Sequence, residues 1–381
     1  MTGRERVLIA LAHQEPDRVP LDIGACAACG INVIAYQNLL KYLEIKCKDI
    51  KLSKLSSQLA FVDELVYKKL GIDVRLIGRE KDTDLIHNIK EESDHYWFVD
   101  EWGKKYKKPK DKGLYYDLVG FPLADIELKD YKWPDPTDPK RFLGLKKEAE
   151  HYKEKNDAAL VFSHTMGNGF LQMGAQLFGY ERWFSMLALE QKKVEEYLER
   201  YLELKIEFWD HLLEQIGDMV DVVCEPDDLG TQDATFISKD MYRRFIKPRQ
   251  KKLFSFIKQR ADVKVLFHSD GSIYDFIPDL IETGVDILNP VQFSAAKMDT
   301  ARLKQEFGKD LVFWGGGIDT QKVLPHGTKQ EIEDEVKKRI DDLAPGGGFV
   351  FAAVHNIQED VPPENIVAML AALNKYGHYK R

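Results

Sequence analysis

The sequence predicts an α/β fold, specifically a closed (β/α)8 barrel that uses residues 1–381 as a single domain. Short, continuous apolar runs recur along the chain, and longer amphipathic segments separate them. Strands that are apolar on both faces are typical of a parallel sheet with helices on either side. Eight such runs match the eight strands of a (β/α)8 barrel. A doubly wound open sheet has the same rhythm and is the alternative that strand counting leaves open.

The elements are predicted from apolar periodicity and from the residues that end each run. A first helix begins at a capping box formed by Thr2 and Glu5, and Pro16 ends it. Amphipathic helices are expected at 192–215, 239–260, 300–307 and 329–343. The eight predicted strands cover residues 19–23, 72–77, 159–163, 220–224, 263–267, 285–288, 311–314 and 349–353.

Residues 84–135 depart from this alternation. Aromatic side chains cluster at 96–102 and at 115–116, on either side of the lysine-rich segment 104–112. Aromatic, alternating segments around a polar segment predict a β-hairpin, with 104–112 as its solvated turn. We expect this hairpin to be inserted as a cap over the barrel mouth, without being a domain of its own.

Composition excludes several classes of function. The net charge is −8, so there is no basic excess to neutralise a nucleic acid. No stretch approaches the roughly 20 apolar residues of a membrane span. Four cysteines are too few for a disulfide framework and are typical of a reduced, cytoplasmic enzyme. Cys26 and Cys29 form a CxxC without a second pair, and we interpret them as ordinary small residues in a loop.

Ionisable and amide side chains follow the predicted strands, where a barrel of this type places its active site. Histidines and carboxylates that converge on a cavity are typical of a zinc site or of acid–base catalysis. We predict Glu225, His268 and Asp270 as catalytic residues, and Glu225, His268 and His355 as metal ligands. The predicted substrate-binding residues are His164, Asp228, Asn289, Gln292 and Asn356 at strand ends, together with Trp97 of the cap.

Two other interpretations of these residues stay open. His268 is also compatible with a structural position in the barrel wall, and Asp228 with the capping of a turn. Even if the cluster is catalytic, the same groups are able to transfer protons without a metal.

The chain resembles the uroporphyrinogen decarboxylase superfamily over essentially its whole length. This resemblance implies a (β/α)8 barrel, but its motifs are shared by enzymes of different activity. They are Glu15-Pro16-Asp17-Arg18-Val19-Pro20 near the start, Asn289-Pro290-Val291-Gln292 and Trp314-Gly315-Gly316-Gly317-Ile318-Asp319 later, and Pro362-Pro363-Glu364-Asn365 near the end.

The superfamily contains two main chemistries, and the resemblance favours the second. Porphyrinogen decarboxylases use an arginine-rich segment after the first strand to bind several carboxylates, but residues 22–30 contain no arginine. The other branch transfers methyl groups to or from a corrinoid (cobalamin) carried by a partner protein. Its thiol-methylating members bind zinc through His-x-Cys and a later cysteine. Here His268 matches the histidine, Asp270 replaces the first cysteine, and His355 lies near the second.

This pattern is similar to the methyltransferases of anaerobic O-demethylation. It implies transfer of a methyl group from a methoxylated small molecule, such as an aryl methyl ether, to the corrinoid of a partner, with zinc as the metal that fits. The aromatic residues Trp97 and Trp102 are suited to cover an aromatic substrate, but a place in the core of the cap is the interpretation that we favour slightly. The alternatives are a decarboxylase or lyase acting on a small acid, and a non-catalytic protein that binds a tetrapyrrole or corrinoid. The oligomeric state stays open, with a homodimer as one option.

Overall fold

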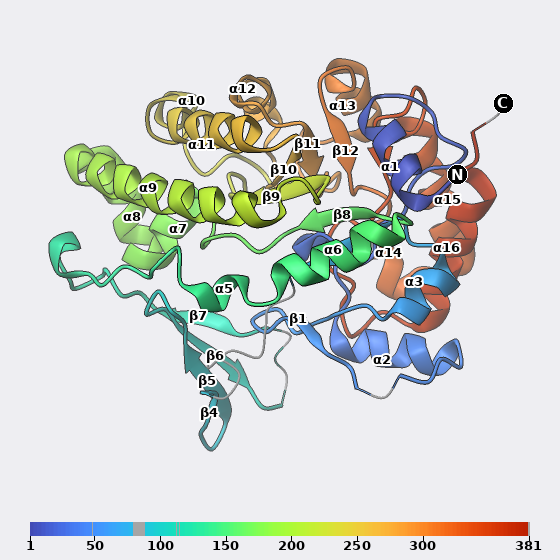
Figure 1. The fold of residues 1–381 in the computed structure, drawn as a ribbon, viewed down its shortest axis with the longest axis horizontal. Helices are drawn as coiled ribbons and strands as arrows, with labels where there is room; N and C mark the ends of the chain where they lie inside the picture. The colour runs from blue at the N-terminus through green and yellow to red at the C-terminus, as the bar shows by residue number, and fades with distance from the viewer. Residues whose placement is uncertain (48, 79–87, 112, 114, 380–381) are drawn as a thin grey trace.

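The computed structural model describes residues 1–47, 49–78, 88–111, 113 and 115–379 (Figure 1). Seven strands form one parallel sheet in an order that follows the chain, and helices surround it. The predicted barrel class is therefore confirmed. In sheet order the strands are β3 (Val74–Ile77), β8 (Ala159–Phe162), β9 (Val222–Pro226), β10 (Lys264–His268), β11 (Ile287–Asn289), β12 (Val312–Trp314) and β13 (Phe349–Val350).

The first predicted strand, 19–23, is reduced to a single bridging residue. Leu21 forms a parallel bridge with Phe351, and the Phe351 N–H donates to the carbonyl of Pro20 at 2.8 Å. On the other side, the Asp73 N–H donates to the carbonyl of Leu21 at 2.9 Å. The segment thus joins the end of β13 to the start of β3 and closes the barrel. Pro20 has no N–H, which limits how far this ladder extends.

Helices cover the outside of the sheet, and the long predicted helices are confirmed. The region predicted as one helix at 239–260 is a continuous run of α10, a π-helical turn at Tyr242–Ile246 and α11. The α-helices are α1 (Gly3–Leu11), α2 (Val33–Tyr42), α3 (Glu64–Leu70), α5 (Pro139–Phe142), α6 (Leu145–Lys155), α7 (Phe170–Phe178), α8 (Tyr180–Leu189), α9 (Gln191–Ile216), α10 (Lys239–Met241), α11 (Lys247–Arg260), α12 (Ile277–Thr283), α13 (Thr300–Phe307), α14 (Val323–His326), α15 (Lys329–Leu343) and α16 (Pro363–Tyr376). None of the helices in the described ranges is long and apolar enough to cross a membrane.

The inserted region forms a cap, but with more strands than the predicted hairpin. Four antiparallel strands, β4 (Lys90–Glu91), β5 (His95–Val99), β6 (Lys105–Pro109) and β7 (Asp117–Gly120), project below the barrel in Figure 1. A smaller sheet of β1 (Leu52–Lys54) and β2 (Leu59–Ala60) lies beside them and is joined to the cap by the Tyr116 N–H, which donates to the carbonyl of Ser56 at 3.0 Å. Residues 84–87, 112 and 114 of the predicted insertion lie outside the described residues.

The prediction that 104–112 is a solvated turn is wrong. Val99 pairs with Lys105 and His95 with Pro109, so the lysine-rich segment is largely strand β6 and the turn lies at 100–104. Asp100 Oδ1 accepts the backbone N–H groups of that turn. The lysines fit a strand because their stems and ammonium groups cover aromatic rings, as Lys105 Nζ does at 4.3 Å from the Trp97 ring centre.

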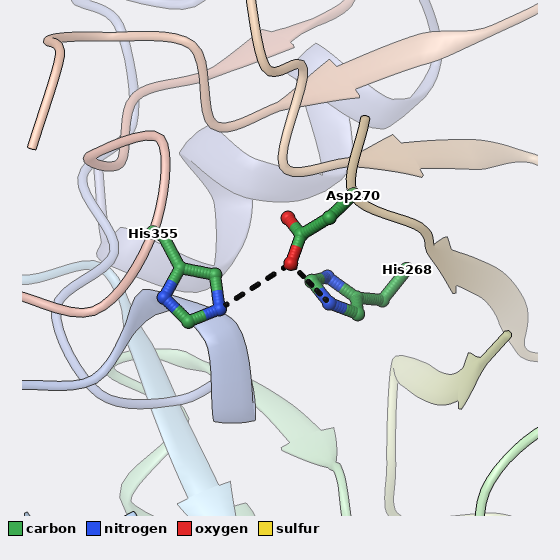
Figure 2. Close-up of side chains that lie close together, drawn as sticks. All are labelled: His268, Asp270 and His355. Atoms are coloured by element: carbon green, nitrogen blue, oxygen red, sulfur yellow. Dashed lines mark ion pairs between the residues drawn. The ribbon is translucent and has the colours of Figure 1, made fainter. Parts of the chain in front are cut away.

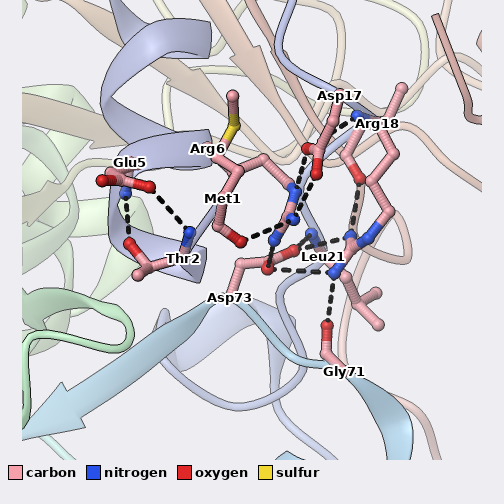
Figure 3. A network of polar contacts seen from close by, with 10 residues as sticks. Met1, Thr2, Glu5, Arg6, Asp17, Arg18, Leu21, Gly71 and Asp73 are labelled. Atoms are coloured by element: carbon pink, nitrogen blue, oxygen red, sulfur yellow. Dashed lines mark hydrogen bonds and ion pairs between the residues drawn. The ribbon is translucent and has the colours of Figure 1, made fainter.

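A buried ion-pair network fastens the N-terminal segment to β3 beside the closing residue Leu21 (Figure 3). Asp73 accepts hydrogen bonds from Arg6 Nη1 at 2.5 Å and from Arg18 Nη1 at 2.8 Å. It also accepts the backbone N–H of Leu21 at 2.8 Å, so one carboxylate joins two arginines and the closing segment. Asp17 takes a second pair of hydrogen bonds from Arg6.

We predict that Asp73→Ala lowers the free energy of unfolding by about 3–5 kcal/mol, because it leaves two arginines and a backbone N–H without their shared buried acceptor. Denaturant unfolding of the purified variant measures this change. Asp63→Ala is the control: its carboxylate only caps α3, through the Leu65 N–H at 2.8 Å, so its loss should cost about 1 kcal/mol. Equal losses in the two variants would contradict the role assigned to Asp73.

Candidate functional site

A cavity of about 480 Å³ lies between the cap and the carboxyl ends of the barrel strands. Its volume is within the usual range for pockets that bind small molecules. The barrel contributes His268, Asp270 and His355, whereas the cap contributes mainly aromatic side chains, including Phe98 and Trp102. The barrel therefore supplies both histidines of the cluster and Asp270, and the cap supplies an aromatic wall.

Three of these side chains converge on one point (Figure 2). His268 is the last residue of β10, Asp270 follows two residues later, and His355 lies in the loop after β13. Asp270 Oδ2 lies 3.8 Å from His268 Nε2 and 3.6 Å from His355 Nε2. One donor atom from each residue lies within 4.8 Å of the other two. Sequence reasoning named all three residues, although it proposed Asp270 for catalysis rather than for metal binding.

Asn289, the last residue of β11, fixes the orientation of His268. Its Nδ2 donates to the carbonyl of Trp314 at 2.8 Å, which directs Oδ1 toward His268 Nδ1 at 2.7 Å. His268 therefore donates from Nδ1 and presents Nε2 to the cavity, as histidine ligands of metals usually do. Asn289 was predicted to bind substrate, but it is fully buried beneath the site and acts as a positioning residue.

The geometry of the cluster fits a zinc ion. Nitrogen and oxygen ligands at the usual zinc distances lie about 3.4 Å apart in a tetrahedral site. The separations of 3.8 and 3.6 Å around Asp270 are close to this value. Two histidines and one carboxylate are also the ligand set of catalytic zinc sites, which keep a fourth position open. Here the cavity adjoins the cluster on that side.

Burial and neighbouring charges shift the pKa values of the two histidines in opposite directions. Burial lowers the pKa of His268, but the Asp270 and Asp228 carboxylates outweigh it and raise the pKa above the ordinary value. In His355 burial dominates and lowers the pKa, although Asp270 opposes it. Burial also raises the pKa of Asp228, whose Oδ2 accepts a hydrogen bond from Gln172 Nε2 at 2.6 Å. The cavity therefore holds a histidine and a carboxyl group that both retain protons more readily than usual.

Glu225, predicted as a catalytic residue and a metal ligand, is not brought together with His268, Asp270 and His355. Glu225 Oε2 forms an ion pair with Lys205 Nζ at 2.9 Å, and Oε1 accepts the Trp209 Nε1–H at 2.6 Å. Both partners belong to α9, so the carboxylate faces the helical layer and not the cavity. Side chains alternate along a strand, and here the neighbours Cys224 and Pro226 line the cavity instead.

The remaining predicted substrate residues divide into two groups. Asp228, His164 and Asn356 line the cavity. Gln292 does not: its Oε1 accepts the Gly271 N–H at 2.8 Å and supports the loop after β10. Trp97 lies under the ammonium groups of two cap lysines, away from the cavity, and the tryptophan that lines the cavity is Trp102.

Sequence reasoning missed a cluster of thiols beside the site. Cys26 and Cys224 both line the cavity, and Cys29 is buried behind them, where its sulfur accepts a hydrogen bond from Asn289 Nδ2 at 3.3 Å. Hydrogen bonds from the Cys224 and Cys29 thiols lower the pKa of Cys26. The available signal was the position of the CxxC directly after the first predicted strand, at the end of the barrel where active sites form.

We predict that His268→Ala and His355→Ala each weaken zinc binding by more than the 10–100-fold that is typical of losing an outer hydrogen-bond partner. Competition with a chelator of known affinity measures this. Glu225→Gln should bind zinc like the unchanged protein, because its side chain contacts α9. Zinc affinity that survives His268→Ala and falls in Glu225→Gln would reverse this assignment.

The raised pKa of His268 predicts how zinc binding depends on pH. A proton on Nε2 competes with the metal, so affinity should rise with pH through the His268 pKa. Asp228→Asn removes one of the charges that raise this pKa, and the midpoint should therefore move to lower pH. Zinc titrations at a series of pH values measure it. Asp262→Asn, on the exposed loop before β10, is the control, and identical midpoints in both variants would contradict the prediction.

Comparison with known proteins agrees with the fold and identifies the family. A methyltransferase from Methanosarcina mazei superposes with a TM-score of 0.67 at 18% sequence identity, over 99% of this chain and 99% of that chain. A GH113 β-1,4-mannanase reaches a TM-score of only 0.39 at 9% identity, over 94% and 99% of the two chains, which is too low to support an argument. A search of curated proteins gave no match.

The match to the Methanosarcina protein shows that the two chains share a fold. The family follows from the sequence itself, because residues 127–376 match the profile of the family described as Uroporphyrinogen decarboxylase (URO-D). This match covers well over half of the chain, and the chain therefore belongs to the uroporphyrinogen decarboxylase family.

Proposed function

We propose that this protein is a corrinoid-dependent methyltransferase that moves a methyl group from a methoxylated small molecule to the corrinoid of a partner protein. The observation that carries the proposal is the convergence of His268, Asp270 and His355 at the base of a cavity with an aromatic wall. The structurally similar Methanosarcina protein is a methyltransferase, and this likeness supports the same activity class.

Demethylation of an ether needs an acid at the oxygen that the methyl group leaves. The C–O bond breaks when the reduced cobalt of the partner's corrinoid attacks the methyl carbon, and the bonding electron pair stays on the oxygen. Bound zinc would supply Lewis-acid stabilisation of this oxygen. Asp228 lines the same cavity, and because burial raises its pKa it is suited to give the oxygen a proton.

The cavity does not suit decarboxylation of a porphyrinogen. A substrate with many carboxylates needs several bidentate partners, which arginine provides best. The described residues that line the cavity include Lys54 and Lys104 but no arginine. Lys104 is buried, and its Nζ already contacts Gln176 Oε1 at 3.0 Å and Asp100 Oδ2 at 3.4 Å.

Methyl transfer is tested by supplying the protein with methoxylated aromatic compounds and free cob(I)alamin, and by following formation of methylcobalamin from its absorbance. We expect turnover with the zinc-loaded protein and a loss of about 100-fold or more in His268→Ala, because the leaving oxygen is no longer stabilised. Lys105→Met, on the Trp97 side of the cap sheet, is the matched control and should keep full activity. Absence of methyl transfer together with release of CO2 from a small acid would favour the decarboxylase alternative.

A further inference from the structure

The charged groups that line the cavity fall into two sets. The first set, at the barrel end, contains Asp228 and Asp270, which interact with His268 and His355. Two further carboxylates of the lining, Asp100 and Glu101, are paired with Lys104 and with Arg141. The basic set lies where the β1–β2 hairpin meets the cap: the charge of Lys54, at the end of β1, acts on both His164 and Lys104. The metal-binding chemistry uses the first set only, and the second set is left without a role.

Lys54 differs from Lys104 in having no partner. Within the described parts of the chain, Lys54 makes no ion pair or hydrogen bond, although its side chain is half-buried and lines the cavity. Lys104, by contrast, has Asp100 and Gln176 within reach. A partly desolvated ammonium group is costly unless an anion compensates it. The ammonium group of Lys54 is therefore a positive charge in the cavity lining that no described carboxylate pairs with.

Apart from Lys104, which is paired with Asp100, the groups considered beside Lys54 are neutral. Burial and the charge of Lys54 lower the pKa of His164 to about 3, so its imidazole is uncharged. His164 Nε2 is buried and has no hydrogen-bond partner in the part of the chain that the structure describes. Ser56 and Ser57 line the same end of the cavity. One ammonium group with a few neutral donors matches a monoanion such as a carboxylate, whereas a phosphate would favour several cations.

Aromatic rings of the cap line the cavity together with Lys54. Phe98 and Tyr106 are stacked with ring centres 5.0 Å apart, and Tyr116 meets Phe98 edge-on at 5.0 Å. All three line the cavity. Such a wall favours contact with a flat ring. Lys54, these aromatic rings and the His268–Asp270–His355 cluster therefore line one cavity.

We propose that Lys54 determines specificity by binding the carboxylate of an aromatic acid, whose ring lies along the cap and whose opposite end reaches the His268–Asp270–His355 cluster. Identification of this acid as the methyl donor rests on the proposed function, but the binding site for the carboxylate does not. Lys54 lies in the β1–β2 hairpin, outside every motif that marks the family resemblance.

Calorimetric titration with benzoate and with its neutral analogue benzamide tests the proposal without any methyl transfer. The zinc-loaded protein should bind benzoate at least about tenfold more tightly than benzamide, because a charge-assisted hydrogen bond is lost in the amide. Lys54→Met should remove this preference and leave benzamide binding within about twofold. Lys54→Arg should restore most of it. Lys105→Met, on the Trp97 side of the cap sheet, is the matched control and should behave like the unchanged protein.

Thermal unfolding of each variant shows that it is folded before it is titrated, and Lys54→Gln serves as a second neutral substitution. Equal affinity for benzoate and benzamide in the unchanged protein, absence of benzoate binding, or undiminished benzoate binding in Lys54→Met and Lys54→Gln would each overturn the proposal. Lys54-dependent benzoate binding without any methyl transfer would overturn the proposed function and leave the carboxylate site standing.

Discussion

Closure of the parallel sheet is the constraint on which the rest of the structure depends. Without the hydrogen bonds of Leu21, strands β3 and β13 would be open edges. The segment that closes the sheet is short, and Asp73 holds it by accepting the Leu21 N–H while it pairs with Arg6 and Arg18.

Closure brings the carboxyl ends of all the parallel strands to one barrel mouth. His268 ends β10 and His355 lies in the loop after β13, and β11 and β12 separate these two strands, which would lie about 14 Å apart in a flat sheet. In the curved sheet their ring centres lie 6.1 Å apart.

The orientation and protonation of His268 depend on the buried Asn289 behind the site and on the carboxylates that line the cavity. Asn289 donates from Nδ2 to the Trp314 carbonyl and accepts a hydrogen bond from His268 Nδ1 at its Oδ1. It thereby determines that His268 Nε2 faces the cavity. Asp228 and Asp270 then bias the same imidazole toward its protonated form. A proton on this nitrogen would compete with a metal bound by the cluster. Both carboxylates raise the pKa of His268, and burial in turn raises the pKa of Asp228.

The cap contributes side chains of a different kind from those at the barrel mouth. The barrel mouth offers carboxylates, imidazoles and thiols, whereas the cap and the β1–β2 hairpin offer aromatic rings and ammonium groups. Lys90 of β4 and Lys105 of β6 cover Trp97 and keep one face of the cap sheet polar, while Phe98, the neighbouring residue in β5, turns to the cavity. The alternation of a β-strand thus lets one short segment contribute to the polar face of the cap and to the cavity wall.

The sequence by itself determined the barrel, the long helices and the identity of the clustered residues His268, Asp270 and His355. Buried parallel strands and amphipathic helices leave a local periodic pattern, and strand-end positions follow from it. Only the tertiary structure decided which way each strand-end side chain points. Glu225 follows the same pattern as His268, yet it faces α9, because Lys205 and Trp209 satisfy its buried carboxylate there. The proximity of Cys26 to Cys224, and of Lys54 to the cap, could not be predicted from the sequence either. These contacts join segments far apart in the chain, and no local periodicity records them.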